Sequence, residues 1–262
     1  MYEDFLEDIA QRNALREVNP YCKLAAGLGA IVLSLLSASY IPPLFIALVM
    51  TAALILLARI DVRTYAALFG IPFLFAGLSV AVIVLITGGR EVFWSWNIVS
   101  GLTLSITRES INEGFFVFCR FLGGMSALCF ISLTTPMTDL FVVMRQCRIP
   151  VVLIELSMII YRTIFILLHQ LMQIYQAQIM RMGYSSLRES IHSFATLCGA
   201  VFIASWTAGE DLIQAMDARC YRGKFAILGE TQPVDRTSLL VVGGFLAGTL
   251  VIVVLSGTIP II

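Results

Sequence analysis

Long uncharged stretches dominate the chain, and short polar or charged segments separate them. Residues 24–58 contain no Asp, Glu, Lys or Arg, and the sequence YIPP at 40–43 interrupts them. A membrane-spanning helix needs about 20 mostly apolar residues, and a Pro pair interrupts a helix. The stretch therefore predicts two short spans joined by a tight turn. With later apolar runs, the pattern predicts five spans, at about 24–40, 43–58, 67–88, 114–135 and 238–259.

Two further apolar segments, 151–182 and 189–222, are too long for simple spans. As straight helices each would be about 50 Å long, whereas a hydrocarbon core is about 30 Å thick. The second segment carries ionisable residues near both ends, including Glu210, which lipid contact disfavours. In the first, four polar residues recur every seven positions and share one helical face: Glu155, Arg162, His169 and Gln176. We predict two long amphipathic helices at the cytoplasmic face; two ordinary spans with polar extensions are the alternative.

The composition indicates a membrane protein. Hydrophobic residues make up 59% of the 262 residues, and mean hydropathy is +0.91. Charged residues make up 13%, about half the share of a soluble domain. We therefore predict an all-α fold, a polytopic membrane protein with about five spans plus the long amphipathic helices. It divides into N-terminal membrane helices (1–135), helices at the cytoplasmic face (136–236) and a C-terminal membrane helix (237–262).

The distribution of charge predicts the orientation. Net charge is zero, so no overall field favours nucleic acid or another charged partner. With a cytoplasmic N-terminus, most of the 17 Lys and Arg residues fall on the cytoplasmic side, which is the bias that membrane proteins show. Trp94 and Trp96, in the polar stretch 89–113, suit a membrane interface. Residues 1–20 are acidic and polar, which is unlike a secretory signal peptide.

Motifs of enzymes and metal sites are missing from the sequence. It contains no GxSxG, no HExxH and no GxxxxGK[ST], and its six Cys and two His are widely scattered. The sequence MDAR at 216–219 resembles part of a membrane alcohol phosphotransferase site, but that site needs several spaced Asp and Asp217 is alone. We expect a chain that is no enzyme and holds no metal or cofactor of its own.

Arg120 is the one basic residue well inside a predicted span. An ionisable residue there marks a functional group, paired with a carboxylate or facing the protein interior. Alternatively, its side chain snorkels to the membrane surface, or the predicted span boundary is misplaced. The sequence leaves both interpretations open.

Two Arg–Gly clusters end the long helices, in QAQIMRMGYSS (176–186) and QAMDARCYRGK (214–224). A cation in a last helical turn complements the helix dipole, and a following Gly supplies a left-handed residue, so Gly183 and Gly223 fit plain helix caps. Arg also offers a rigid, permanently charged fork that carboxylates accept in pairs of hydrogen bonds. An exposed Arg at a helix tip is thus a candidate anchor for an acidic groove on another protein.

The chain resembles the transmembrane energy-coupling (T) subunit of ECF-type ABC transporters, most closely the cobalt branch called CbiQ. The segments that carry the resemblance run in order along nearly the whole chain: NALREVNPYCKL (13–24), TTPMTDL (134–140), RIP (148–150), Arg162, AQIMRMGYSSLRESI (177–191) and GEDLIQAMDARCYRG (209–223).

The resemblance implies membrane helices plus crossed cytoplasmic coupling helices. In the family each coupling helix ends in a short Arg motif, often Ala-Arg-Gly, that docks into a groove of an ATPase subunit. The matching residues here are Met180-Arg181-Met182 and Ala218-Arg219-Cys220. Both keep the Arg and lack the final Gly, although Gly183 and Gly223 follow soon after.

The resemblance also implies partners and a location. The partners are two ABC-type ATPase subunits that hydrolyse ATP, a substrate-binding membrane subunit that supplies the metal ligands, and a small accessory membrane subunit as a further candidate. The location is the cytoplasmic membrane of a prokaryote. The expected role is to couple ATP hydrolysis to import of cobalt, with nickel or another substrate as the alternative. A self-sufficient secondary transporter is the rival from another class, but it needs polar groups near the midplane, and the predicted spans offer few beyond Arg120.

Overall fold

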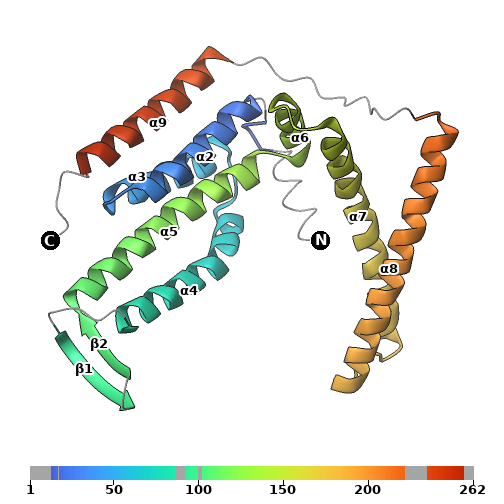
Figure 1. The fold of residues 1–262 in the computed structure, drawn as a ribbon, viewed down its shortest axis with the longest axis horizontal. Helices are drawn as coiled ribbons and strands as arrows, with labels where there is room; N and C mark the ends of the chain where they lie inside the picture. Colours follow the sequence, from blue (N-terminus) through green and yellow to red (C-terminus); the bar gives the residue numbers. More distant parts are fainter. Residues whose placement is uncertain (1–12, 17, 87–91, 100–101, 222–234, 257–262) are drawn as a thin grey trace. The chain divides into compact units, whose positions relative to one another are not determined.

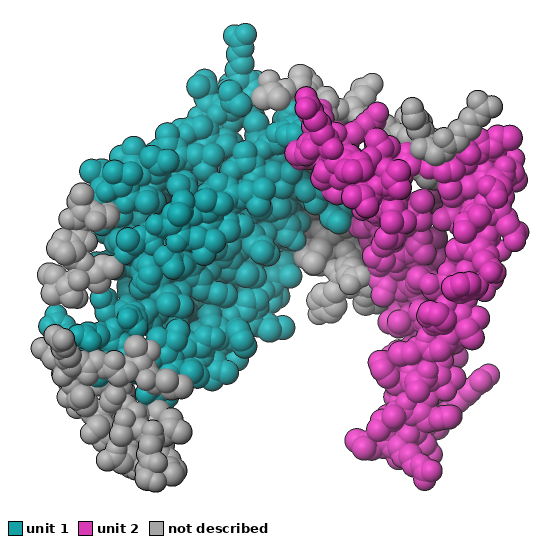
Figure 2. Space-filling view, in the orientation of Figure 1, with its two compact units in different colours: residues 1–140, 230–262 teal, residues 141–229 magenta. Residues whose placement is uncertain are grey.

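The computed structural model describes residues 13–16, 18–86, 92–99, 102–221 and 235–256. The chain folds as two compact units, each described by itself below. Unit 1 comprises residues 1–140 with 230–262, and unit 2 comprises residues 141–229 (Figure 2).

Unit 1 is a bundle of apolar helices. Figure 1 shows its members α2 (Pro20–Leu36), α3 (Ile41–Ala52), α4 (Val62–Ile86), α5 (Arg108–Thr134) and α9 (Arg236–Ser256). The helix α3 continues through a short π-helical turn, η1 (Ala53–Leu57). Each predicted span corresponds to a helix, with boundaries displaced by a few residues.

The break between α2 and α3 follows from local chemistry. Asn19 caps the start of α2 by accepting a hydrogen bond from the Tyr21 N–H, and Pro20 occupies the first turn, where its missing N–H costs nothing. The helix ends at Leu36, before the proline pair is reached. The expectation that the Pro pair ends this helix is therefore wrong. Pro42 and Pro43 instead lie in the first turn of α3.

The core of unit 1 forms around α5, which packs against α2, α3 and α4, while α9 packs on α2 and α3. Ile46, Leu54 and Leu133 contribute fully buried side chains. The helices α3 and α5 approach closely at Gly123, where an added Cβ would lie 2.8 Å from the carbonyl oxygen of Pro43. The hydrophobic pattern thus produces a layer of tightly packed helices.

The polar stretch after α4 contains a short antiparallel hairpin of β1 (Val92–Val99) and β2 (Leu102–Thr107), which the sequence analysis did not assign. The chain then enters α5 through a reciprocal cap, in which the side chains of Thr107 and Ser110 each bond the other's backbone N–H. The hairpin apart, the expected helical fold is confirmed.

Unit 2 consists mainly of two long helices, α7 (Val151–Met180) and α8 (Leu187–Ala218). The preceding helix α6 (Met137–Gln146) begins in unit 1 and ends in unit 2. Because only residues 181–186 connect them, α7 and α8 form an antiparallel helical hairpin (Figure 1). We call α7, α8 and their connecting turn the helical hairpin.

Five of the described helices are long and apolar enough to cross a membrane, but they are not the five that the sequence pattern predicts. They are α4, α5, α7, α8 and α9, while α2 and α3 with η1 are shorter apolar helices. Both helices of the hairpin qualify by length and composition, which is the alternative that the sequence left open. Their position at the cytoplasmic face stays a prediction.

Candidate functional site

The first Arg cluster forms a closed turn at the end of α7. Arg181 is the C-cap residue, and the N–H of Met182 donates to the carbonyl oxygen of Ile179 at 3.0 Å. The N–H of Gly183 donates to the carbonyl oxygen of Gln178 at 2.9 Å. This pair of hydrogen bonds is the Schellman motif, which satisfies carbonyl groups that the helix end leaves free.

The second cluster repeats this geometry at the end of α8. Arg219 is the C-cap residue, and the N–H of Cys220 donates to the carbonyl oxygen of Asp217 at 3.0 Å. The N–H of Tyr221 donates to the carbonyl oxygen of Met216 at 3.1 Å. Both candidate docking residues therefore have the same backbone setting, one residue before the left-handed position. We call these two turns the Arg181 turn and the Arg219 turn.

The left-handed residue of each turn is not the glycine that the sequence analysis expected. Met182 has a φ of 61° and Cys220 a φ of 55°, so the non-glycine residues of the Arg motifs occupy this position. In the Ala-Arg-Gly pattern that the resemblance implies, Gly would stand there, and Gly adopts this conformation without steric cost. Gly183 follows the left-handed residue, and Gly223 lies outside the described residues.

Both Arg residues are exposed, and they lie at opposite ends of the helical hairpin (Figure 1). Since α8 has 32 residues, about 48 Å of helix separates the two ends. The neighbours in each motif are exposed as well: Met180, Met182, Ala218 and Cys220. Met180 is 85% exposed and Met182 is 73% exposed, so apolar surface lies on both sides of Arg181.

Three side-chain hydrogen bonds tie the Arg181 turn together and link it to the start of α8. Gln178 donates to the carbonyl oxygen of Ser193 at 3.0 Å, and the Ser193 hydroxyl donates to the carbonyl oxygen of Gly183 at 2.8 Å. The Tyr184 hydroxyl donates to the Gln178 side chain at 2.9 Å. Burial raises the pKa of the Tyr184 hydroxyl. The turn is therefore held on both sides of Arg181.

A long-range hydrogen bond connects the Arg219 turn to the start of α7. The Tyr221 hydroxyl donates to Oε2 of Glu155 at 2.7 Å, across 66 positions of sequence. This bond, and then burial, raises the pKa of Tyr221. Tyr221 is not among the predicted site residues. The only signal for it in the sequence is that an aromatic residue directly follows the Arg motif.

The predicted polar stripe of α7 does not behave as one surface. Glu155 is 5% exposed and lies in the contact just described, whereas Arg162 and His169 are exposed. On α8, Glu210 is exposed and accepts a hydrogen bond from the indole N–H of Trp206 at 2.9 Å. The structure therefore separates Glu155, near the Arg219 turn, from the other polar candidates.

Arg120 lies within the helical bundle of unit 1. Its Nη2 donates to the carbonyl oxygen of Ser37 at 2.6 Å, and its guanidinium lies 4.5 Å from the ring centre of Phe116. Ser37 is the C-cap residue of α2, so a cation here complements the negative end of that helix. Of the interpretations that the sequence left open, the structure supports a side chain that faces the protein interior.

The N-terminal segment caps the C-terminal end of α5. Lys23 Nζ donates to the carbonyl oxygen of Thr134 at 3.1 Å, and the Asn13 side chain donates to that of Leu133 at 3.0 Å. The carboxyl of Asp139 interacts electrostatically with Lys23 and Arg16. Burial raises the pKa of this carboxyl, and the positive charges of Lys23 and Arg16 partly offset the rise. The segment NALREVNPYCKL (13–24) carries part of the family resemblance, but the sequence pattern alone predicts no role for Asn13 or Lys23.

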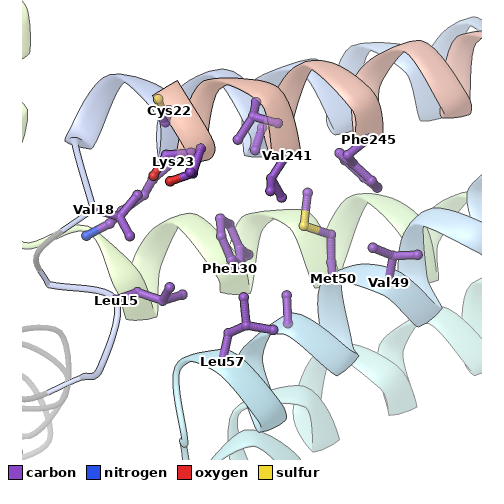
Figure 3. Close-up of a pocket in the computed structure, with 15 residues that line it drawn as sticks. Leu15, Val18, Cys22, Lys23, Val49, Met50, Leu57, Phe130, Val241 and Phe245 are labelled. Carbon is purple, nitrogen blue, oxygen red and sulfur yellow. The ribbon is translucent and has the colours of Figure 1, made fainter. Parts of the chain in front are cut away.

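An apolar cavity of about 270 Å³ lies between helices of unit 1. Figure 3 shows Phe130 of α5, Met50 of α3 and Val241 and Phe245 of α9 around it, with Lys23 and Cys22 of α2 at one side. The lining is almost entirely apolar. Over the described ranges, no group of three or more His, Cys, Asp or Glu residues is arranged to hold a metal ion.

Comparison with known proteins decides the family. The sequence model of the CbiQ family, described as "Cobalt transport protein", matches residues 11–228, most of the chain. The chain belongs to the CbiQ family. It is thus a multi-pass membrane protein and a transmembrane component of a transport system, as the resemblance predicted.

Named relatives of the chain agree with this assignment. A protein described as a fused cobalt transport protein, CbiMQ, from Methanocorpusculum labreanum is 40% identical over 94% of this chain. The chain spans 41% of the length of that fusion protein. An uncharacterised protein of Methanocaldococcus jannaschii is 34% identical over 91% of this chain and 87% of its own length. The energy-coupling factor transporter transmembrane protein EcfT of Limosilactobacillus fermentum is 25% identical over 66% of this chain and 67% of its own.

Proposed function

We propose that this CbiQ family member is the coupling subunit of an ATP-driven importer of the energy-coupling factor type, with cobalt ions as the substrate. One observation carries the proposal. Arg181 and Arg219 are exposed, occupy the same turn geometry and lie at opposite ends of one helical hairpin. Two equivalent Arg turns suit two equivalent partner subunits, one at each end of the helical hairpin.

The chemistry of the tips favours an acidic groove on an ABC-type ATPase subunit. A guanidinium group is always charged and presents donors in a fixed fork, so a carboxylate can bind it with two parallel hydrogen bonds. The exposed apolar side chains of Met180 and Met182 would be covered when the Arg181 turn enters such a groove. The Schellman turn fixes the direction in which each Arg leaves its helix.

The coupling itself is mechanical in this proposal. ATP binding brings the two ATPase subunits together, and each carries one Arg turn with it. The rigid helices pass that movement to the membrane helices, which tilt a substrate-binding membrane subunit. The chain catalyses no reaction; its ATPase partners hydrolyse ATP, and a small accessory membrane subunit is a further candidate partner.

Cobalt is proposed because the family description and the fused relative both name cobalt transport. That relative also supports a close association between this type of chain and another transport protein, since it is a fusion. Nickel in the same role is the alternative. Uptake of radioactive cobalt and of radioactive nickel by the same cells distinguishes the two.

The proposed location is the cytoplasmic membrane of a prokaryote, with the N-terminus in the cytoplasm. The support is the excess of Lys and Arg on the side that this orientation makes cytoplasmic. Both Arg turns must lie on that side, because ATP is found there. Labelling of the exposed Cys220 by a membrane-impermeant thiol reagent, with the exposed Cys147 and Cys198 replaced by Ser, tests this orientation in intact cells and in inverted vesicles.

The decisive experiment is a pull-down of the tagged chain from its native membrane. It compares the wild type with the double variant Arg181→Ala/Arg219→Ala. Arg63→Ala is the control, because Arg63 is exposed on α4 and lies outside both turns. We expect ABC-type ATPase subunits with the wild type and the control, and a strong loss with the double variant.

The expected size of the loss depends on whether docking removes water from the ion pair. Removal of one Arg from a desolvated pair costs about 3–5 kcal/mol, whereas an exposed pair contributes less than about 1 kcal/mol. Arg219→Ala should therefore abolish metal uptake while the chain still inserts into the membrane. If no ATPase subunit is recovered, even after crosslinking, and the chain alone imports metal without ATP, the secondary-transporter hypothesis replaces this one.

A further inference from the structure

The helical hairpin is closed at one end and open at the other. At the Arg181 turn, six residues connect α7 directly to α8. The Arg219 turn lies at the other end, and in Figure 1 the two helices cross and then separate toward it. The backbone hydrogen bonds described for the Arg219 turn go to carbonyl groups of α8. Tertiary contacts must therefore hold this turn relative to α7.

Tyr221 provides such a contact. It follows the left-handed Cys220 directly, so its backbone belongs to the Arg219 turn, and its hydroxyl donates to Glu155 at 2.7 Å. Glu155 is 5% exposed, although most of its neighbours in the first turns of α7 are exposed. A buried carboxylate needs hydrogen-bond donors, and a bond to a charged acceptor is stronger than one between neutral groups.

We propose that Glu155 and Tyr221 are positioning residues that lock the Arg219 turn to the start of α7, so that a pull on Arg219 moves both helices of the hairpin. This inference rests on the proposed docking function of Arg219. The lock adds a direct connection from the Arg219 turn to the start of α7. Through the lock, a pull on Arg219 also reaches the first turns of α7. These follow α6 along the chain, and α6 begins in unit 1.

The Arg181 turn supplies an internal control. Tyr184 there also donates to a side chain, that of Gln178. That turn keeps two other hydrogen bonds, through Gln178 and Ser193, and the short covalent connection when the Tyr184 hydroxyl is removed. Tyr221→Phe and Tyr184→Phe therefore remove equivalent hydroxyl groups, one at the open end and one at the closed end.

The first measurement tests the lock without any partner. Spin labels are placed on Cys220 and on Val152→Cys in the full chain in lipid nanodiscs, with the exposed Cys147 and Cys198 replaced by Ser. We expect one narrow distance distribution between the labels in the parent protein and in Tyr184→Phe. Tyr221→Phe should broaden it. Equal, narrow distributions in both variants would overturn the lock.

The second measurement tests its role in coupling. The probes are the ABC-type ATPase subunits that co-purify with the wild type, and the readout is metal imported per ATP hydrolysed in reconstituted vesicles. We expect a decrease of about tenfold in Tyr221→Phe, the size expected for loss of a hydrogen bond to a charged group. Glu155→Leu should behave alike, whereas Glu155→Gln keeps an acceptor oxygen and should retain most coupling.

The outcomes separate this inference from the proposed function. If the wild type couples and Tyr221→Phe and Glu155→Leu couple equally well, the positioning role is wrong and the docking function stands. If the wild type recruits no ATPase subunit, the docking function fails and the positioning role fails with it. A selective loss in Tyr221→Phe, with normal coupling in Tyr184→Phe, supports both.

Discussion

The ammonium group of Lys23 donates a hydrogen bond to the carbonyl oxygen of Thr134 at 3.1 Å, across 111 positions of sequence. Thr134 is the last residue of α5, whose final carbonyl groups have no partner within the helix. Lys23 is 3% exposed, so the bond is shielded from water. The N-terminal segment therefore acts as a cap for the central helix of unit 1.

Removal of this cap should destabilise the protein. Lys23→Met keeps the length of the side chain and strands the Thr134 carbonyl, which costs about 1–3 kcal/mol in the free energy of unfolding. The measurement is unfolding by sodium dodecyl sulfate in mixed micelles. Arg63→Met, at an exposed position, is the control and should change stability by less than about 0.5 kcal/mol. Equal effects of the two substitutions would contradict the capping role.

The left-handed residues of the two Arg turns predict stabilising substitutions to glycine. A non-glycine residue in this conformation costs about 1–2 kcal/mol, so Met182→Gly and Cys220→Gly should each raise the free energy of unfolding by about 1 kcal/mol. Met180→Gly, two residues earlier and helical, should instead lower it by about 0.5–1 kcal/mol. Thermal unfolding in detergent compares these variants. If Met180→Gly and Met182→Gly changed the free energy of unfolding in the same direction, the left-handed conformation assigned to Met182 would be wrong.

Gly183 is required by space rather than by backbone conformation. A Cβ at this position would lie 2.7 Å from Oγ of Ser193 and 3.1 Å from the carbonyl oxygen of Gln178. Gly183→Ala should therefore separate the Arg181 turn from α8 and lower stability by about 1–3 kcal/mol. Gly199→Ala on α8 is the control, because an added Cβ there meets no atom within 4 Å and should stabilise the helix by up to about 1 kcal/mol. Stabilisation by both substitutions would refute the close contact.

Arg120 is predicted to stabilise the bundle rather than to take part in transport. Arg120→Leu removes its bond to the Ser37 carbonyl and its contact with Phe116, so the free energy of unfolding should fall by about 1–3 kcal/mol. Metal uptake per folded molecule should stay normal at a permissive temperature. Arg108→Leu, at an exposed position at the start of α5, is the matched control. A stable Arg120→Leu protein without uptake would instead assign Arg120 to the transport pathway.

Much of the fold follows from hydrophobic pattern and length. Each predicted apolar segment is a helix, and the ends of α7 and α8 lie within a few residues of the predicted ones. The errors have local causes. A Pro pair predicts the end of a helix, but proline also fits the first turn of a helix, as Pro42 and Pro43 show. Gly183 was expected to be left-handed because glycine prefers that conformation, but Met182 takes it.

Local sequence alone predicts which segments are helical, where the two Arg residues lie along them, and which family the chain resembles. Apolar runs, prolines and short motifs are local properties, and the chain carries them without its fold. Tertiary structure decided the partners of Lys23, Arg120 and Glu155, because the groups they contact are 66 to 111 positions away in sequence. It also decided that α7 and α8 form a hairpin with an Arg at each end. Spacing along a chain defines one helical face, but only packing brings Tyr221 to Glu155.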